Sequence, residues 1–437
     1  MLESRSAVRT VDFSSGQVLF LAVWIALAAA VVIASWRADA FVGWTVAIAL
    51  TGYVLGGFAF GAYAQNVRGR DYLAPDEQAF QNEAVQIVDG WRTGQPHVPR
   101  IAGGWPYVNA VVVRTWGPSL VPMRLLTALA GAATVAATYW LARLVFESVP
   151  IARLAAIFVL LSPSLLVWSL TNLKERPLGL VLVVGMALSV LVVRRWTLMR
   201  WMLLAGAIYL VGALRHYYAP LLAWLVLAGF AAFSSAPWRQ RVMQLAALTV
   251  SLGFVVQLNT GTFLGLNTFQ ETVVRYVPNQ TAVGGSQGGD EDYSTIGQTA
   301  GHGQEVTDFE GARFSRSLAF VLFGGFDSRQ GAGRVLELVF WPEWLANFLL
   351  FPLALWALAD TVRRRQLMPL LPIAFVAGLV LLLAYTHGDD WSTLRFRAVY
   401  WPFYLMIAAA GAVQLYQSGP FRRFSYRHPN LVTQPEV

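Results

Sequence analysis

Two adjacent carboxylates, Asp76 and Glu77, follow Pro75 shortly after a long apolar stretch. Charged groups beside a bilayer are costly to desolvate, so such a pair needs either a function or full solvation. A carboxylate aimed at a hydroxyl group can accept its proton during attack, which makes Asp76 a candidate general base. The alternative is a helix start, because acidic residues ahead of an amphipathic run stabilise the positive end of a helix. On these residues alone both interpretations stay open.

Three short basic segments could bind an anionic substrate. They are Lys174-Glu175-Arg176, Arg215-His216-Tyr217-Tyr218 and Arg395-Phe396-Arg397. Guanidinium groups form paired hydrogen bonds with phosphate oxygens, and a lysine adds a point charge. Together the segments could hold a phosphate or pyrophosphate headgroup. Taken singly, each is better explained by ion pairs and by basic side chains that extend from helix ends to the interface.

The sequence gives no strong cofactor or metal site. The five histidines lie far apart and lack the spacing of zinc ligands, and the chain has no cysteine. The acidic run 290–292 lies in a glycine-rich polar stretch, 281–304, where it could bind a divalent cation. A solvated acidic run is the better explanation, so we predict no cofactor and keep a divalent cation as the alternative.

The composition places these groups in a membrane protein. Of the 437 residues, 56% are hydrophobic and 13% are charged, about half the charge content of a globular domain. Uncharged runs recur along the chain, among them 16–36, 40–67 and 217–238. Each is long enough to cross about 30 Å of hydrocarbon at 1.5 Å per residue. We therefore predict an all-α fold, a polytopic transmembrane helical bundle, and exclude a set of soluble domains.

The apolar runs predict eleven spans. They cover roughly 16–36, 40–64, 120–143, 152–172, 177–193, 199–214, 218–236, 242–258, 336–359, 367–386 and 398–416. The chain then divides into two N-terminal spans (1–64), an outer loop with the acidic motif (65–119), a transmembrane core (120–258), a second outer loop (259–335), C-terminal spans (336–420) and a cytoplasmic tail (421–437). In the first outer loop, the stretch 77–91 repeats apolar residues at helical spacing, which predicts an amphipathic helix on the membrane surface.

The basic residues orient the bundle. The net charge is +8, and arginines concentrate in short connections near 194–200, 239–241 and 363–365 and in the C-terminal tail. Such connections are typical of the cytoplasmic side, so lipid headgroups explain the charge and we predict no nucleic-acid partner. Both long loops and the three basic segments then lie outside. Arg5 and Arg9 fit this count poorly, which leaves the N-terminal topology open.

With these features in place, the chain resembles the GT-C superfamily of integral-membrane glycosyltransferases, which includes protein O-mannosyltransferases and aminoarabinose transferases. The segment YLAPDEQAFQNEA matches the family's acidic motif in the first large outer loop. The helices in 124–146 and 155–173, the segment SLTNLKERPLGLVLVV, and the segments SLAFVLFGGFDSR and STLRFR are similar to bacterial members. Two spans precede the acidic loop here, where the family usually has one.

The resemblance implies transfer of a sugar from a polyprenyl-phosphate donor to a hydroxyl of a protein, lipid or glycan acceptor. The transfer would proceed with inversion on the outer face of a bacterial cytoplasmic membrane. By the same resemblance, Asp76 would deprotonate the acceptor and Glu77 would assist it. Lys174, Arg176, Arg215 and Arg397 would stabilise the departing lipid phosphate, where negative charge develops.

Two other classes of protein remain as alternatives. A polysaccharide polymerase or O-antigen-type ligase would use a diphosphate-linked glycan and would rely on Arg215 and His216. A transporter or a non-catalytic scaffold would need no base at Asp76. Transporters usually show internal repeats and charges near the bilayer midplane, and neither feature is evident in this sequence.

Overall fold

The computed structural model describes residues 14–69, 72, 75–99, 103–234, 236–261, 263–265, 315, 318–319, 321–322, 333–386 and 391–418. Within them, the side chains of residues 68, 75, 263, 333–340, 385–386 and 391–395 are left out. The described residues form helices and no strand, as predicted. The acidic run 290–292 and the glycine-rich segment around it lie outside the described residues.

Ten of the eleven predicted spans correspond to single helices in the structure. The helices are α1 (Ser15–Ala38), α2 (Ala40–Arg68), α3 (Pro75–Thr93), α4 (Trp105–Trp116), α5 (Leu120–Phe146), α6 (Val149–Leu161), α7 (Pro163–Ser169), α8 (Glu175–Arg194), α9 (Leu198–Leu214), α10 (Tyr218–Phe233), α11 (Trp238–Thr260), the short 3-10 turn η1 (Phe263–Gly265), α14 (Gly333–Arg363), α15 (Leu370–Thr386) and α16 (Trp391–Ser418).

One predicted span is wrong as a continuous helix. The run 152–172 is divided into α6 and α7, which meet at an angle of 61°. Proline has no backbone N–H, and it disfavours helical geometry in the residue before it. Ser162 is accordingly extended (φ −69°, ψ 117°), and its side chain caps the new helix that Pro163 begins.

Seven of the described helices are long and apolar enough to cross a membrane, or eight if the bent pair α6–α7 is one span. Three more, α9, α10 and α15, are apolar but shorter. This result is consistent with the predicted helical membrane protein.

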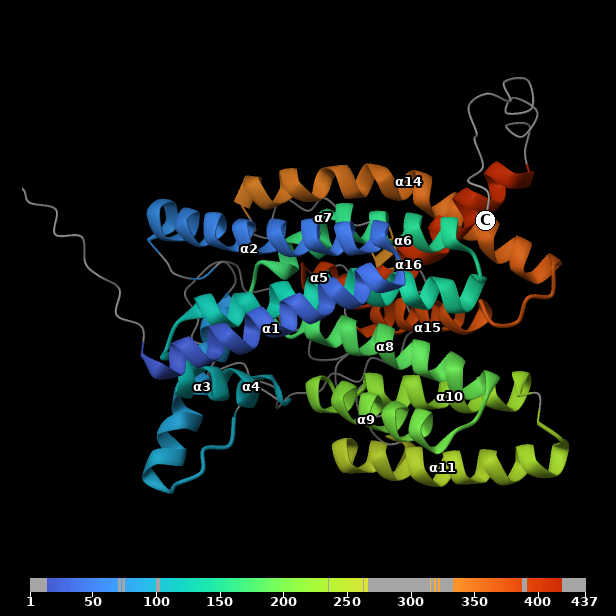
Figure 1. The fold of residues 1–437 in the computed structure, drawn as a ribbon, viewed down its shortest axis with the longest axis horizontal. Coiled ribbons are helices and arrows are strands. Elements are labelled where there is room, and N and C mark those ends of the chain that lie inside the picture. The colour runs from blue at the N-terminus through green and yellow to red at the C-terminus, as the bar shows by residue number, and fades with distance from the viewer. Residues whose placement is uncertain are drawn as a thin grey trace, which may run out of the picture.

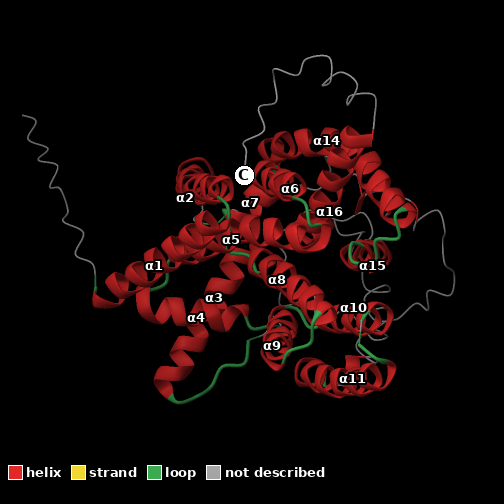
Figure 2. Ribbon diagram, turned by 45° about the vertical axis from the view of Figure 1, so that its right-hand side comes forward, coloured by secondary structure: helices red, strands yellow, loops and turns green. Residues whose placement is uncertain are grey.

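The bundle has buried central helices and peripheral ones whose apolar surface is exposed. In Figure 1, α5, α8 and α16 lie in the middle, α14 lies along one side, and α9, α10 and α11 form the opposite side. The view in Figure 2 shows the same order. Of the apolar segment of α16, 83% of the residues are buried, against 11% for α1 and 22% for α11. A bilayer would cover the apolar side chains of these peripheral helices.

Small residues let the central helices approach closely. Gly411 of α16 faces the backbone of α14, where an added Cβ atom would lie 1.8 Å from the carbonyl oxygen of Leu353. Gly131 of α5 faces Ser169 and Tyr53, and an added Cβ atom there would lie 2.5 Å from the Ser169 hydroxyl oxygen. Close backbone approach at glycine is a common way to pack membrane helices, because contact area replaces the hydrophobic effect as the driving force.

The amphipathic helix predicted over 77–91 is α3. The apolar face of α3, formed by Phe80, Ala84, Ile87 and Val88, is buried. The last three pack against α4 and the beginning of α5, in a small core of their own. Protein rather than lipid therefore covers this part of the face, and α3 is fixed at the end of the bundle where α2 finishes and α5 begins.

Candidate active site

The adjacent acids occupy the first turn of α3. The helix-start interpretation is therefore correct for their position, and it does not exclude a chemical role. The two side chains differ in their surroundings. Glu77 has no exposed surface, whereas Asp76 is partly exposed.

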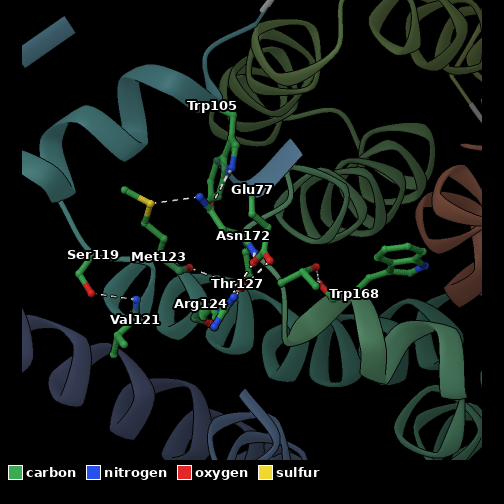
Figure 3. A network of polar contacts seen from close by, with 10 residues as sticks. Glu77, Trp105, Ser119, Val121, Met123, Arg124, Thr127, Trp168 and Asn172 are labelled. Atoms are coloured by element: carbon green, nitrogen blue, oxygen red, sulfur yellow. Dashed lines mark hydrogen bonds and ion pairs between the residues drawn. The ribbon is translucent and has the colours of Figure 1, made fainter. Parts of the chain in front are cut away.

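Glu77 pairs with an arginine of α5. The Nε and Nη2 atoms of Arg124 donate hydrogen bonds to the two carboxylate oxygens of Glu77, at 3.1 and 3.2 Å (Figure 3). Arg124 is 7% exposed, so the ion pair is removed from water. This paired geometry holds both charges in a fixed orientation. The arrangement joins the start of α3 to the start of α5.

A second link joins Glu77 to the connection between α7 and α8. The backbone N–H of Asn172 donates to Glu77 Oε1 at 2.6 Å. The Asn172 side chain accepts a hydrogen bond from Trp105 Nε1 at 3.2 Å and donates to the Met123 sulfur at 3.1 Å (Figure 3). Glu77 thus fixes the position of α3 relative to α4, α5 and α8. This arrangement supports a positioning role for Glu77.

Asp76 stands one helical turn before Phe80, a neighbour of Lys174. Residues four apart share one face of a helix, so Asp76 and Phe80 are neighbours on that face. The Lys174 ammonium lies 5.7 Å from the centre of the Phe80 ring. Lys174 is 7% exposed and stands at the start of α8, which gives this side of α3 a positive charge.

The structure brings the first two basic segments together. Arg215, in the connection between α9 and α10, lies 3.9 Å from the carboxylate of Glu175. Its guanidinium group also lies 5.3 Å from the ring centre of Tyr217 and 3.9 Å from that of Phe396 at the start of α16. The predicted segments 174–176, 215–218 and 395–397 therefore meet at the end of the bundle that also holds α3.

His216 faces the same group of charges. Burial lowers the pKa of the His216 imidazole below its ordinary value of 6.5, and the nearby positive charges of Arg215 and Lys174 lower it further. The ring packs edge-on against Tyr217, with their centres 5.5 Å apart. A neutral imidazole at pH 7 can accept or donate a hydrogen bond without adding a further positive charge.

Arg176 points into the bundle rather than toward this surface. Its side chain is fully buried, and its Nη2 atom donates to the carbonyl oxygen of Gly131 in α5 at 3.2 Å. Among the described residues, the Nε and Nη1 atoms of Arg176 have no hydrogen-bond partner, and no carboxylate forms an ion pair with it. A buried charge without a counter-charge is costly, which makes this position a candidate for an anionic ligand.

Arg397 belongs to a different network. Its Nη1 atom lies 3.7 Å from the carboxylate of Glu343 in α14, and its Nη2 atom donates to the Val321 carbonyl oxygen at 3.0 Å. Glu343 in turn accepts hydrogen bonds from the hydroxyls of Ser162 and Ser164, at 3.0 and 2.8 Å. The charge of Arg397 is thus compensated at the bend between α6 and α7. Its predicted contact with a phosphate stays a prediction, and the side chain of Arg395 lies outside the described ones.

Three important residues of these networks had no role in the sequence-based site: Arg124, Asn172 and Glu343. Arg124 and Glu343 carry charge inside apolar runs, and such residues usually mark a buried pair or a functional site. That rule could have identified both. Nothing in the sequence marks Asn172, because its part depends on a backbone N–H.

Over the described residues, no group of three potential metal ligands is close enough to hold an ion.

A pocket of about 420 Å³ lies beside the Glu77–Arg124 pair, between the end of α2, α3 and the start of α5. Its lining includes Arg124 itself together with Gln65, Gln81 and Ser119.

Comparison with known proteins gives no assignment for any of these features: no protein family, curated protein or solved structure matches this chain.

Proposed function

We propose that the protein is a membrane glycosyltransferase of the GT-C type, which transfers a sugar from a polyprenyl-phosphate donor to an acceptor hydroxyl. The observation that carries the proposal is the group formed by Lys174, Arg215 and His216, in which Lys174 lies against Phe80, one helical turn from Asp76 on α3. A carboxylate beside a group of cations is what transfer from a lipid phosphate to a hydroxyl requires.

In the proposed reaction, Asp76 accepts the proton of the acceptor hydroxyl. The acceptor oxygen forms a bond to the anomeric carbon, and the bond between that carbon and the phosphate oxygen breaks. The phosphate leaves with the bonding electrons, so its negative charge grows in the transition state. Lys174 and Arg215 stabilise that charge, and the configuration at the anomeric carbon is inverted.

Glu77 has a supporting part in this mechanism. Its bonds to Arg124 and Asn172 fix the first turn of α3, and this fixes the direction in which Asp76 points. Such rigidity matters, because a shift of about 1 Å in a catalytic group can reduce a rate by roughly 100-fold.

We further propose eleven crossings of a bacterial cytoplasmic membrane. They are the long apolar helices, the bent pair α6–α7 and the shorter helices α9, α10 and α15. The pair of Arg194 and Glu147, 2.7 Å apart, joins the basic connection after α8 to the end of α5. Both lie at the other end of these helices from Asp76. The concentration of arginines in such connections supports a cytoplasmic location for them, with Asp76 outside.

The test is donor consumption by purified protein in lipid nanodiscs, with a panel of polyprenyl-phosphate monosaccharides and a matched panel of diphosphate-linked sugars. Cell-envelope extract supplies the acceptor. The proposal predicts consumption of a monophosphate donor and a labelled product. Consumption of diphosphate-linked donors alone would instead favour the polymerase or ligase, whose reaction would rest on Arg215 and His216.

A further inference from the structure

The pocket between α2, α3 and α5 has a polar part and an apolar part. Gln65, Gln81 and Ser119 contribute amide and hydroxyl groups, whereas Val54, Phe58 and Leu125 contribute apolar surface. Phe58 is 53% exposed on a candidate membrane span, so the apolar part meets the outer surface of the bundle. A pocket of this composition suits a molecule with a hydrophobic tail and a polar head.

The charges around the pocket indicate the kind of head. Among the described side chains that line it, Arg124 is the one that carries a charge, and the carboxylate of Glu77 compensates that charge through two hydrogen bonds. The other polar groups are amides and hydroxyls, which donate and accept hydrogen bonds alike. Sugar and glycerol hydroxyls also do both. An anionic phosphate, in contrast, would meet among these side chains only the positive charge that Glu77 already compensates.

The pocket and the proposed base share helix α3. Gln81 is one helical turn beyond Glu77 on the same face of α3. Measured along the helix axis, Gln81 is about 7.5 Å from Asp76, at 1.5 Å per residue. The cationic group of Lys174 and Arg215 lies against α8 and α16, whereas the pocket lies against α2 and α5. Two substrates could therefore approach α3 from different helices.

We propose that this pocket binds a membrane lipid with an uncharged, hydroxyl-bearing headgroup, and that such a lipid is the sugar acceptor. The second part rests on the proposed function. The phosphate of the donor would bind at the cationic group, and the acceptor would present a hydroxyl from the pocket side of α3. The acceptor is then a lipid within the bilayer and not a soluble protein.

Two glycines of α2 provide a matched pair of variants. Gly57 lines the pocket, and an added Cβ atom there has no other atom within 4 Å. The Cβ atom of Gly57→Leu should therefore meet no clash, the rest of the side chain should occupy pocket space, and leucine favours a helix more than glycine does. Gly52 also has open space around it and is exposed, but it does not line the pocket. Gly52→Leu is the control for the same change on the same helix.

The experiment uses the full chain in vesicles that contain one of three photoreactive probes with identical acyl chains: glucosyl diacylglycerol, phosphatidylglycerol or phosphatidylcholine. After illumination, mass spectrometry measures labelling of the peptides around 54–65 and 118–125. The proposal predicts that the glucosyl lipid gives the strongest labelling. It also predicts that Gly57→Leu lowers this labelling by about tenfold, which corresponds to about 1.4 kcal/mol of binding free energy. Gly52→Leu should leave it unchanged.

Equal labelling by the three probes, or labelling that survives Gly57→Leu, would show only contact with surrounding lipid and would overturn the proposal. Donor consumption in the same vesicles separates this result from failure of the proposed function. If the donor is consumed equally well without any hydroxyl-bearing lipid, the acceptor assignment is wrong and the transferase proposal stands. If no donor is consumed while the labelling is specific, lipid binding stands and the transferase proposal with its acceptor fails.

Discussion

The carboxylate of Glu77 and the guanidinium group of Arg124 form two hydrogen bonds, 3.1 and 3.2 Å long, with neither side chain more than 8% exposed. The pair explains why two adjacent acids have different environments. Glu77 connects α3 to α5 and to the connection before α8, while Asp76 remains partly exposed one helical turn before Phe80, a neighbour of Lys174. One residue of the motif thus has a structural role, whereas the other keeps exposed surface at the first turn of α3.

This pair predicts a large loss of stability when one partner is removed. Glu77→Gln leaves the buried Arg124 without its counter-charge, at a cost of roughly 3 kcal/mol or more in the free energy of unfolding. Thermal unfolding in detergent measures the loss. Glu147→Gln is the matched control, because Glu147 pairs with Arg194 while its side chain is 71% exposed. Its change should stay within about 0.5 kcal/mol. Equal effects of the two variants would contradict the structural role of Glu77.

The surroundings of Asp39, at the end of the bundle away from Asp76, predict a loss of stability in acid. Burial raises the pKa of its carboxyl, but hydrogen bonds from Arg153, Tyr139 and the Phe41 backbone lower it more, so the pKa falls below its ordinary 3.8. A lowered carboxyl pKa gives stability that is present above the unfolded value and is lost as the pH falls through the folded value. Asp39→Asn should therefore lower the melting temperature at pH 7 and have less effect below about pH 3.8. If the difference in melting temperature between Asp39→Asn and the unmodified protein stayed constant from pH 7 to below pH 3.8, the lowered pKa of Asp39 would be contradicted.

The surroundings of His216 predict a histidine that is neutral at pH 7. Burial lowers its pKa below 6.5, and Arg215 and Lys174 lower it further. The pKa of His216 is lower in the folded than in the unfolded protein. The stability that this difference contributes is therefore complete above pH 6.5 and is lost as the pH falls through the pKa of the folded protein. An NMR titration of labelled histidine should give a midpoint below 6.5, and Lys174→Met should raise it. A midpoint at or above 6.5 in the unmodified protein would rule out this environment.

The contact between α14 and α16 predicts intolerance of a single methyl group. Gly411→Ala would place a Cβ atom 1.8 Å from the Leu353 carbonyl oxygen, so the helices must separate. Such overpacking costs about 1–3 kcal/mol. Gly206→Ala on α9 is the control, because an added Cβ atom there meets no atom within 4 Å. Removal of glycine from an exposed helix position should instead stabilise the protein by about 0.5–1 kcal/mol. If both variants melt alike, the close approach is wrong.

Much of the helical architecture could be predicted from the sequence, because uncharged runs and amphipathic spacing depend on local residue order. The bend at Pro163 was missed because the apolar run continues across it, although the proline itself is a local signal. The shared location of the segments 174–176, 215–218 and 395–397 at one end of the bundle could also be predicted, because successive spans alternate in direction across the membrane.

The pairing of charges could not be predicted in this way. Glu343 bonds to Ser164, 179 positions away along the chain, and the partner of Glu77 is 47 positions away. Such partners depend on how helices pack, and one sequence contains no information on distances between them. For the same reason, the pocket beside Arg124 could be found only in the structure.

The most direct test of the central claim compares Asp76→Asn with Asp89→Asn. Both variants replace a carboxylate by an amide on α3, but Asp89 is 62% exposed and pairs only loosely with Arg92, at 3.8 Å. The measurement is the rate of sugar transfer from the consumed polyprenyl-phosphate donor in nanodiscs, with melting temperature recorded for each variant. Loss of a general base predicts a rate lower by about 100-fold or more for Asp76→Asn, in protein that stays folded at the assay temperature, and a normal rate for Asp89→Asn. A normal transfer rate for Asp76→Asn would contradict the account.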